Sequence, residues 1–251
     1  MSKIALITGG SRGLGKNTAL ALADKGLDVV VTYHSQQNQA QAVVDEIKCK
    51  GQKAAALKLN LGDANSFSDF LSALKTSLAT NFGNERIHYL INNGGMGINV
   101  AFDETTEQQF DTLLNVHMKG AFFITQSLLP IIHDGGSILN ISTGLTRFSL
   151  PGYCAYAMMK GGVEVMTRYL AKELGKRQIR INTLAPGAIE TDFNSGANRD
   201  NKNLNQQIAK QTALGRVGLP DDIGKLISLL LSDDATWLTG QRIEASGGMF
   251  L

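Results

Sequence analysis

One stretch near the start of the chain predicts the fold: Thr8-Gly9-Gly10-Ser11-Arg12-Gly13-Leu14-Gly15. A short apolar run at residues 3–8 leads into it, and residues 16–25 continue from it with helical spacing. A strand, a glycine-rich turn and a helix in this order form a phosphate cradle, because glycines allow a close backbone approach and the helix N-terminus favours negative charge. The stretch therefore predicts a nucleotide-binding unit.

The rest of the chain alternates strands with helices. Apolar runs predict six further strands, at residues 28–33, 54–59, 86–91, 137–141, 179–184 and 242–245. Helical spacing predicts helices at residues 36–50, 64–81, 104–118, 120–133, about 153–174, 203–213 and 222–231. This alternation is typical of a doubly wound parallel sheet, and no linker or repeat interrupts it. We predict a single α/β domain over residues 1–251, with helices flanking a Rossmann-like parallel sheet.

A second stretch carries residues suited to proton transfer, S-T-G-L-T-R-F-S-L-P-G-Y-C-A-Y-A-M-M-K at residues 142–160. Ser142 follows the predicted strand 137–141, at the end of the sheet where such folds bind ligands. Tyr156 and Lys160 are four residues apart on a predicted helix and therefore share a face. A phenol has a pKa of about 10, which a nearby ammonium group lowers. With Ser142 as a hydrogen-bond donor, the three side chains suit proton exchange with a carbonyl or alcohol oxygen.

Composition argues against several other classes of protein. The chain has 251 residues, 43% hydrophobic and 18% charged, with a net charge of +2 and no long basic block. Charge therefore gives no support to nucleic-acid or membrane-surface binding. We find no signal peptide and no apolar stretch that could span a bilayer. The two cysteines, Cys49 and Cys154, lack a disulfide or metal-ligand pattern, so we expect free thiols, no metal and a cytoplasmic location.

These motifs together resemble the short-chain dehydrogenase/reductase family over essentially the whole chain. Residues 8–15 are similar to its T-G-x-x-x-G-x-G loop, and residues 92–95 are similar to its N-N-A-G motif. Asn115 is similar to its helix asparagine, and its catalytic residues correspond to Ser142, Tyr156 and Lys160. Its P-G-x-x-x-T segment corresponds to Pro186, Gly187 and Thr191, and its C-terminal glycine motif to residues 240–248. In type, the chain most resembles 3-oxoacyl-carrier-protein reductases.

The resemblance implies interconversion of a ketone and a secondary alcohol with a nicotinamide cofactor. It implies that Tyr156 exchanges the proton, while Lys160 binds the nicotinamide ribose and relays protons with Asn115 and water. The implied cofactor contacts are Gly9, Ser11, Arg12, Gly13, Leu14, Gly15, His34, Asn60, Leu61, Asn92, Gly94, Tyr156, Lys160, Pro186, Gly187, Ile189 and Thr191. We also expect a homotetramer, with helices 104–133 and 153–174 and the last strand at its interfaces.

Three residues depart from the family pattern or leave an alternative open. Gly94 replaces an alanine, which predicts added looseness beside the cofactor. Asn60 stands where many members carry aspartate, and it keeps an acceptor for the adenine without the charge. Tyr153 lies seven residues before Lys160, a spacing that resembles the enoyl reductase branch of the superfamily, which reduces C=C bonds. Carbonyl chemistry through Tyr156 is the favoured interpretation, with Tyr153 lining the substrate pocket.

The choice between NADP and NAD depends on the end of the second strand. A carboxylate there would bind the ribose hydroxyls and repel a 2′-phosphate. The sequence Thr32-Tyr33-His34-Ser35 has none, and Arg12 in the glycine loop can bind a phosphate. We therefore expect NADP to be preferred, with NAD as the alternative.

The substrate is a small carbonyl or alcohol compound whose identity the sequence leaves open. A loop at about residues 190–215 is expected to cover the pocket, with Arg147, Tyr153 and Phe193 among the residues that line it. Arg147 is either a contact for an acidic group or an exposed loop arginine. A non-catalytic NADP-binding sensor on the same fold is the rival hypothesis from another class, but it would not need Tyr156, Lys160, Ser142 and Asn115 together.

Overall fold

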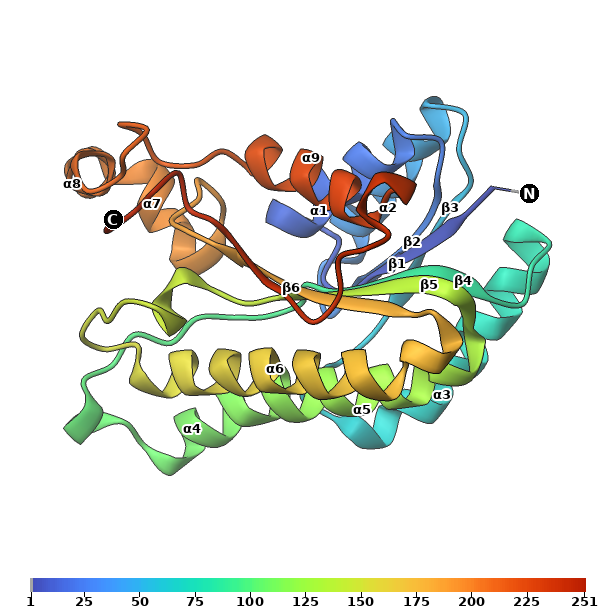
Figure 1. Cartoon of the computed structure of the whole chain (residues 1–251), viewed down its shortest axis with the longest axis horizontal. Coiled ribbons are helices and arrows are strands. Elements are labelled where there is room, and N and C mark those ends of the chain that lie inside the picture. The colour runs from blue at the N-terminus through green and yellow to red at the C-terminus, as the bar shows by residue number, and fades with distance from the viewer. Residues whose placement is uncertain (1) are drawn as a thin grey trace.

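The computed structural model describes residues 2–251 and is built around a seven-stranded parallel sheet (Figure 1). The strand order is β3-β2-β1-β4-β5-β6-β7. The strands are β1 (Ile4–Ile7), β2 (Asp28–Tyr33), β3 (Ala54–Lys58), β4 (Ile87–Asn92), β5 (Ile132–Ile141), β6 (Arg180–Pro186) and β7 (Arg242–Ala245). The order reverses between β1 and β4, so the predicted doubly wound sheet is confirmed. The carboxyl ends of these two strands flank the crevice where such sheets bind ligands.

Helices cover both faces of the sheet, as Figure 1 shows. One face packs against α1 (Gly13–Ala23), α2 (Gln37–Cys49) and α9 (Pro220–Leu231). The other packs against α3 (Phe67–Ser77), α5 (Gly120–Leu128) and α6 (Cys154–Glu173). Each layer buries its own apolar cluster, and the central strands β1 and β4 contribute side chains to both clusters. The strands are buried on both faces, which explains their continuous apolar runs.

The segment between β4 and β5 differs from the prediction. Thr106 starts α4 (Glu107–Leu113) with a capping box, and a π-helical turn, Leu114–Lys119, joins α4 to α5. The helix does not continue to residue 133, because Pro130 lies in a 3-10 turn at Leu129–Ile131 and cannot extend an α-helix. The strand β5 consequently begins at Ile132, five residues before the predicted start.

The substrate loop contains two short helices rather than one. They are α7 (Ala197–Asp200) and α8 (Lys202–Lys210), preceded by a 3-10 turn at Phe193–Gly196. Asn194, Ser195 and Gly196 in that turn all have left-handed backbone conformations, with φ between 50° and 76°. The loop therefore changes direction sharply just before α7.

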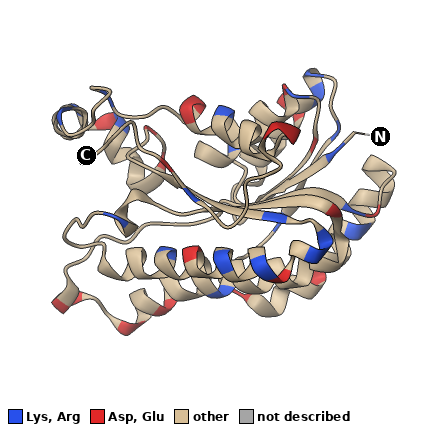
Figure 2. Ribbon diagram, in the orientation of Figure 1, with Lys and Arg blue, Asp and Glu red and all other residues tan. Residues whose placement is uncertain are grey.

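Charged side chains lie mainly on outer helix faces and loops. Figure 2 shows Lys and Arg interspersed with Asp and Glu along α6 and α9, with few charges on the strands. No helix within residues 2–251 is both long enough and apolar enough to cross a bilayer. Cys49 and Cys154 are both exposed and unpaired with each other, in agreement with the expectation of free thiols.

Candidate active site

The glycine loop is held in place by its neighbours at the carboxyl end of the sheet. Gly9 and Gly13 have positive φ angles of 66° and 55°, so only glycine fits both positions without strain. Asn93 Nδ2 donates to the carbonyl oxygens of Thr8 and Gly9, at 2.9 and 3.0 Å. A Cβ atom on Gly15 would lie 2.2 Å from the Gly9 oxygen, so the first turn of α1 packs directly against the loop. The free N–H groups at the start of α1 thus face the crevice.

A cavity of about 710 Å³ runs from this loop to the substrate loop. Nearly all of the predicted cofactor residues line it: Gly9, Ser11, Arg12, Gly13, Leu14, Gly15, His34, Asn60, Leu61, Gly94, Tyr156, Lys160, Pro186, Gly187, Ile189 and Thr191. Tyr153 and Phe193 line its other end, together with Phe148, Leu204, Ile208 and Met249. The volume is large enough for a dinucleotide fragment and a small organic substrate side by side.

Three predicted residues lie outside this cavity. Asn92 turns its amide into the sheet, where Nδ2 donates to Thr125 Oγ1 and Asn140 Oδ1 at 2.9 and 2.8 Å. Arg147 points away from the cavity and forms an ion pair with Glu244, at 2.6 Å, so the substrate-pocket prediction for Arg147 is wrong. Asn115 lies in the π-helical turn but does not reach the cavity wall.

Ser142 and Thr143 both line the cavity that Tyr156 lines, and their hydroxyl groups have different partners. The Ser142 hydroxyl donates to Glu164 Oε1 at 2.6 Å and is therefore not free to donate to a substrate. Thr143 lines the cavity together with Tyr156, and its hydroxyl accepts a hydrogen bond from the Leu145 backbone N–H at 3.3 Å. The two residues follow β5 directly, and in extended backbone successive side chains point to opposite sides. Because the Ser142 hydroxyl is already engaged with Glu164, this arrangement favours Thr143 over the predicted Ser142 as the hydroxyl that donates to a substrate.

Tyr156 is a buried phenol with a raised pKa. Desolvation by burial is the largest cause, the hydrogen bond from Thr143 opposes it, and the nearby Tyr153 adds to it. The expected lowering of the pKa by Lys160 is not among these causes; the Lys160 Nζ atom lies 5.9 Å from the Tyr156 ring centroid. Tyr156 is protonated at neutral pH, which is the form that a general acid requires.

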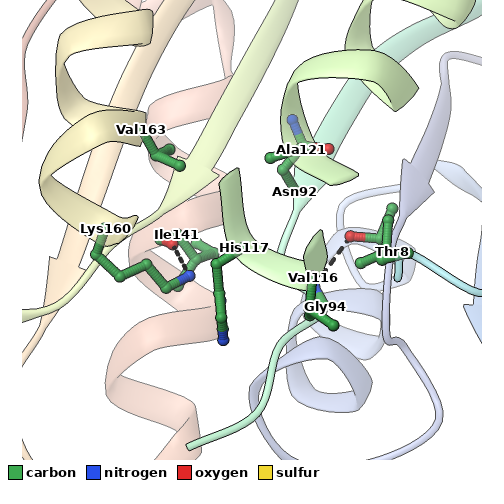
Figure 3. A pocket seen from close by; sticks show the side chains of 10 residues that line it. Thr8, Asn92, Gly94, Val116, His117, Ala121, Ile141, Lys160 and Val163 are labelled. Atoms are coloured by element: carbon green, nitrogen blue, oxygen red, sulfur yellow. Dashed lines mark hydrogen bonds between the residues drawn. The ribbon is translucent and has the colours of Figure 1, made fainter. Parts of the chain in front are cut away.

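Lys160 is held behind Tyr156 by the strand that precedes Ser142. Its Nζ donates to the Ile141 carbonyl oxygen at 2.7 Å, the contact drawn as a dashed line in Figure 3. Burial lowers the pKa of Lys160 to about 8, because the charged form loses hydration. A second cavity of about 10 Å³, room for one water molecule, lies between Lys160, His117 and Asn92.

His117 is a cavity-lining side chain that the sequence did not single out. It comes from the π-helical turn, lines both cavities and is only 2% exposed. Its Nε2 lies 2.7 Å from the Met96 carbonyl oxygen and 3.3 Å from the Met96 backbone nitrogen, and Nδ1 is buried without a protein partner among the described residues. Burial, and then the charge of Lys160, lower the pKa of His117 to about 3. The sequence clue to His117 was its position, two residues after Asn115 on the same helix.

Two departures from the family pattern have a structural explanation. A Cβ atom on Gly94 would lie 2.6 Å from Leu61 Cδ1, so the leucine fills the space of the missing methyl group and the predicted looseness is absent. Asn60 lines the cavity, but its Oδ1 accepts a hydrogen bond from the Gly62 backbone at 3.0 Å. Its acceptor therefore stabilises the turn after β3.

Comparisons with known proteins agree with this architecture. The sequence model of a family described as enoyl-(acyl carrier protein) reductase matches residues 9–250. A 3-oxoacyl-[acyl-carrier-protein] reductase, FabG, from Staphylococcus aureus is 35% identical over 253 residues, covering 100% of this chain and 99% of the relative. The chain belongs to the short-chain dehydrogenase/reductase family.

Solved structures of this family superpose over almost the whole chain. The promiscuous reductase LugOII, which catalyses keto-reduction at C1 during lugdunomycin biosynthesis, has a TM-score of 0.94 at 35% identity, covering 99% of this chain and 98% of its own. The angucycline C-6 ketoreductase LanV with bound NADP has a TM-score of 0.93 at 34% identity, covering 99% and 95%. This member of the short-chain dehydrogenase/reductase family is accordingly an oxidoreductase acting on carbonyl and alcohol groups.

Proposed function

We propose that the protein is an NADPH-dependent ketone reductase in which Tyr156 donates the proton. The observation that carries the proposal is the buried, protonated Tyr156 phenol, which lines one cavity together with Thr143 and the buried Lys160. These groups lie on the wall of the single cavity that joins the glycine loop to the apolar substrate end. A carbonyl oxygen at this point meets a proton donor and a second hydroxyl together.

The bound nicotinamide supplies the hydride that the carbonyl carbon accepts. Tyr156 gives its proton to the carbonyl oxygen, and the Thr143 hydroxyl donates a hydrogen bond to the same oxygen as negative charge develops there. Lys160 places a positive charge beside the phenolate that Tyr156 becomes, which offsets the cost of forming that anion in a buried site. The family pattern implies roles for Ser142 and Asn115. In this proposal Thr143 takes the role of Ser142, and the π-helical turn that carries His117 takes the role of Asn115.

The cradle fits a dinucleotide with a 2′-phosphate. The glycine loop brings the N-terminus of α1 to the cavity, where backbone N–H groups favour a pyrophosphate. Arg12 and His34 line the same end, the second strand ends without a carboxylate, and Arg12 forms no ion pair within residues 2–251. An unpaired guanidinium suits a phosphate. The neighbour LanV, solved with bound NADP, supports the same choice.

The substrate end suits an uncharged, largely apolar ketone. Its walls are aromatic and aliphatic, and its polar groups are neutral amides such as Asn194, Gln207 and Gln211. The one acidic residue there, Asp192, is paired with Arg199, and no lysine or arginine lines that end within the described residues. A free carboxylate or phosphate on the substrate would lose hydration without gaining a counter-charge.

NADPH oxidation with a panel of ketones tests the proposal. The panel holds an aromatic ketone, a diketone and an acetoacetyl thioester, with an enoyl thioester as the C=C substrate. We expect ketone turnover that Tyr156→Phe abolishes and that Tyr153→Phe retains. Turnover of the enoyl thioester alone, lost in Tyr153→Phe, would assign the chain to C=C reduction. NADPH binding without turnover would favour the sensor hypothesis.

Assembly and location are part of the same proposal. Exposed apolar side chains on α5 and α6, including Phe122, Phe123, Met158 and Tyr169, support a homotetramer built through these helices. Two exposed free thiols suit a reducing cytoplasm. Light scattering with size-exclusion chromatography tests the tetramer, and a monomer at micromolar concentration would contradict it.

A further inference from the structure

The carboxylate of Glu164 connects three segments next to the reaction centre. It lies on α6 two turns after Tyr156, and its side chain is only 11% exposed. Its Oε1 atom accepts hydrogen bonds from Ser142 Oγ at 2.6 Å, Thr146 Oγ1 at 2.7 Å and Arg242 Nε at 3.0 Å. The loop after β5 and the last strand, β7, therefore both attach to the helix that carries Tyr156.

Arg242 completes the attachment from the other side of the loop. Its guanidinium donates to the Thr143 carbonyl oxygen at 3.3 Å and to Thr146 Oγ1 at 3.1 Å, and it pairs with Glu244 at 3.0 Å. Thr143 is thus fixed on both sides, through the Ser142 hydroxyl that precedes it and through its own carbonyl group. Its side-chain hydroxyl accepts from the Leu145 N–H at 3.3 Å, which leaves its own proton available to donate, and Thr143 lines the cavity together with Tyr156.

Neither Glu164 nor Arg242 lines the cavity, so neither reaches the substrate or the cofactor there. We propose that Glu164, acting with Arg242, is a positioning residue that holds the Thr143 hydroxyl in the cavity wall that it shares with Tyr156. The inference rests on the proposed function, because it takes Thr143 and Tyr156 as the proton-transfer pair. A small displacement of such a pair reduces the rate of reaction more than it reduces binding.

The Glu164→Gln variant tests this role. The amide keeps the shape of the side chain but removes the charge that Arg242 Nε and the two hydroxyl groups contact, so Arg242 keeps only Glu244 as a counter-charge. We expect kcat for the best ketone to fall about tenfold, with the KM for the ketone and the NADPH affinity within about twofold of wild type. Asp222→Asn is the control, since it breaks a more exposed ion pair, with Arg216 at 2.6 Å, on the separate helix α9. It should lower the melting temperature and leave kcat unchanged.

A double variant separates positioning from a general loss of stability. If Glu164 acts through Ser142, Ser142→Ala combined with Glu164→Gln should lose no more kcat than Glu164→Gln alone. The inference would be overturned if the kcat losses of the two single variants multiplied in the double variant. A folded Glu164→Gln enzyme with wild-type kcat would also overturn it. Should Glu164→Gln not fold, Thr146→Val removes one of the same hydrogen bonds, and an unchanged kcat there overturns it equally. Wild-type turnover that does not depend on Tyr156 would instead overturn the proposed function.

Discussion

The imidazole of His117 stands edge-on to the ring of Tyr156, with ring centroids 5.2 Å apart and planes at 88°. Its Nε2 is bonded to the loop after β4 through Met96, so His117 connects that loop to the proton donor. A charged imidazole here would oppose Lys160, and the buried site keeps His117 neutral. This neutrality has a measurable consequence for stability.

His117 should make the protein less stable in mild acid. In the unfolded chain its pKa is near 6.5, and in the folded chain burial lowers it to about 3. Below pH 6.5 the unfolded state therefore takes up a proton that the folded state does not, and stability falls by up to about 1.4 kcal/mol per pH unit. Denaturant unfolding between pH 7 and 4.5 should show a shallower dependence in His117→Gln. A variant with the wild-type slope would show that His117 is not held neutral.

Thr143→Val and Ser142→Ala should separate the two adjacent hydroxyls. Loss of a hydrogen-bond donor to a developing oxyanion typically costs about 10² to 10³ in kcat, and we expect this for Thr143→Val. Ser142→Ala removes only a contact to Glu164 and should cost at least roughly tenfold less. Steady-state kinetics with one ketone shows which of the two variants loses more kcat. A larger loss of kcat in Ser142→Ala would return the catalytic role to Ser142.

Arg12→Ala should weaken NADPH much more than NADH. The guanidinium lies at the end of the cavity beside the second strand, where only NADPH carries a phosphate. Loss of a charge-assisted contact of about 1.5–3 kcal/mol predicts a roughly 10- to 100-fold drop in the NADPH-to-NADH ratio of kcat/KM. Lys16→Ala, which breaks a neighbouring surface ion pair with Glu46, is the control and should leave the ratio unchanged. An unchanged ratio in Arg12→Ala would remove the basis for the NADP assignment.

Gln207→Lys should let the enzyme accept an acidic ketone. Gln207 lines the substrate end, whereas its neighbour Gln206 does not. A cation there supplies the counter-charge that a carboxylate lacks, so kcat/KM for a keto acid relative to its methyl ester should rise roughly tenfold. Gln206→Lys should leave that ratio unaltered. If wild type already reduced the acid as well as the ester, the neutral-substrate proposal would fail.

Gly94→Ala should destabilise the protein, and a smaller residue at position 61 should restore it. The added methyl group would meet Leu61 Cδ1 at 2.6 Å, and because this atom is the movable end of a side chain, we expect a loss at the low end of the about 1–3 kcal/mol that overpacking costs. The double variant Gly94→Ala with Leu61→Val removes the clashing atom and should recover most of that loss. Thermal unfolding checks both variants, and additive losses would show that the two positions do not compete for space.

The sequence was sufficient for the sheet, the glycine loop and the Tyr156–Lys160 pair, because each depends on local spacing. Strands buried on both faces give unbroken apolar runs, and residues four apart on a helix share a face whatever the tertiary structure. Proline at position 130 was also visible, although the prediction extended a helix through it.

The choice between neighbouring polar residues could not be made in the same way. Whether Ser142 or Thr143 faces Tyr156 depends on where β5 ends and on Glu164, which lies 22 residues away. The π-helical turn shifts the helix register, so it presents His117 rather than Asn115 to the cavity. Arg147 pairs with Glu244 and does not line the pocket. Glu244 lies 97 residues further along the chain, so no local sequence pattern reveals this pair.

The attachment of Arg147 has a practical consequence for handling the protein. Arg147 holds the carbonyl groups of Met249 and Phe250, and Met249 forms part of the substrate-end wall. An affinity tag joined after Leu251 would therefore emerge beside the entrance for substrate. A tag joined before Ser2 would emerge at the opposite end of the molecule, as Figure 1 shows, where Ser2 contacts only the turn at Gly26. Assays on this protein are best made with the tag at that end or removed.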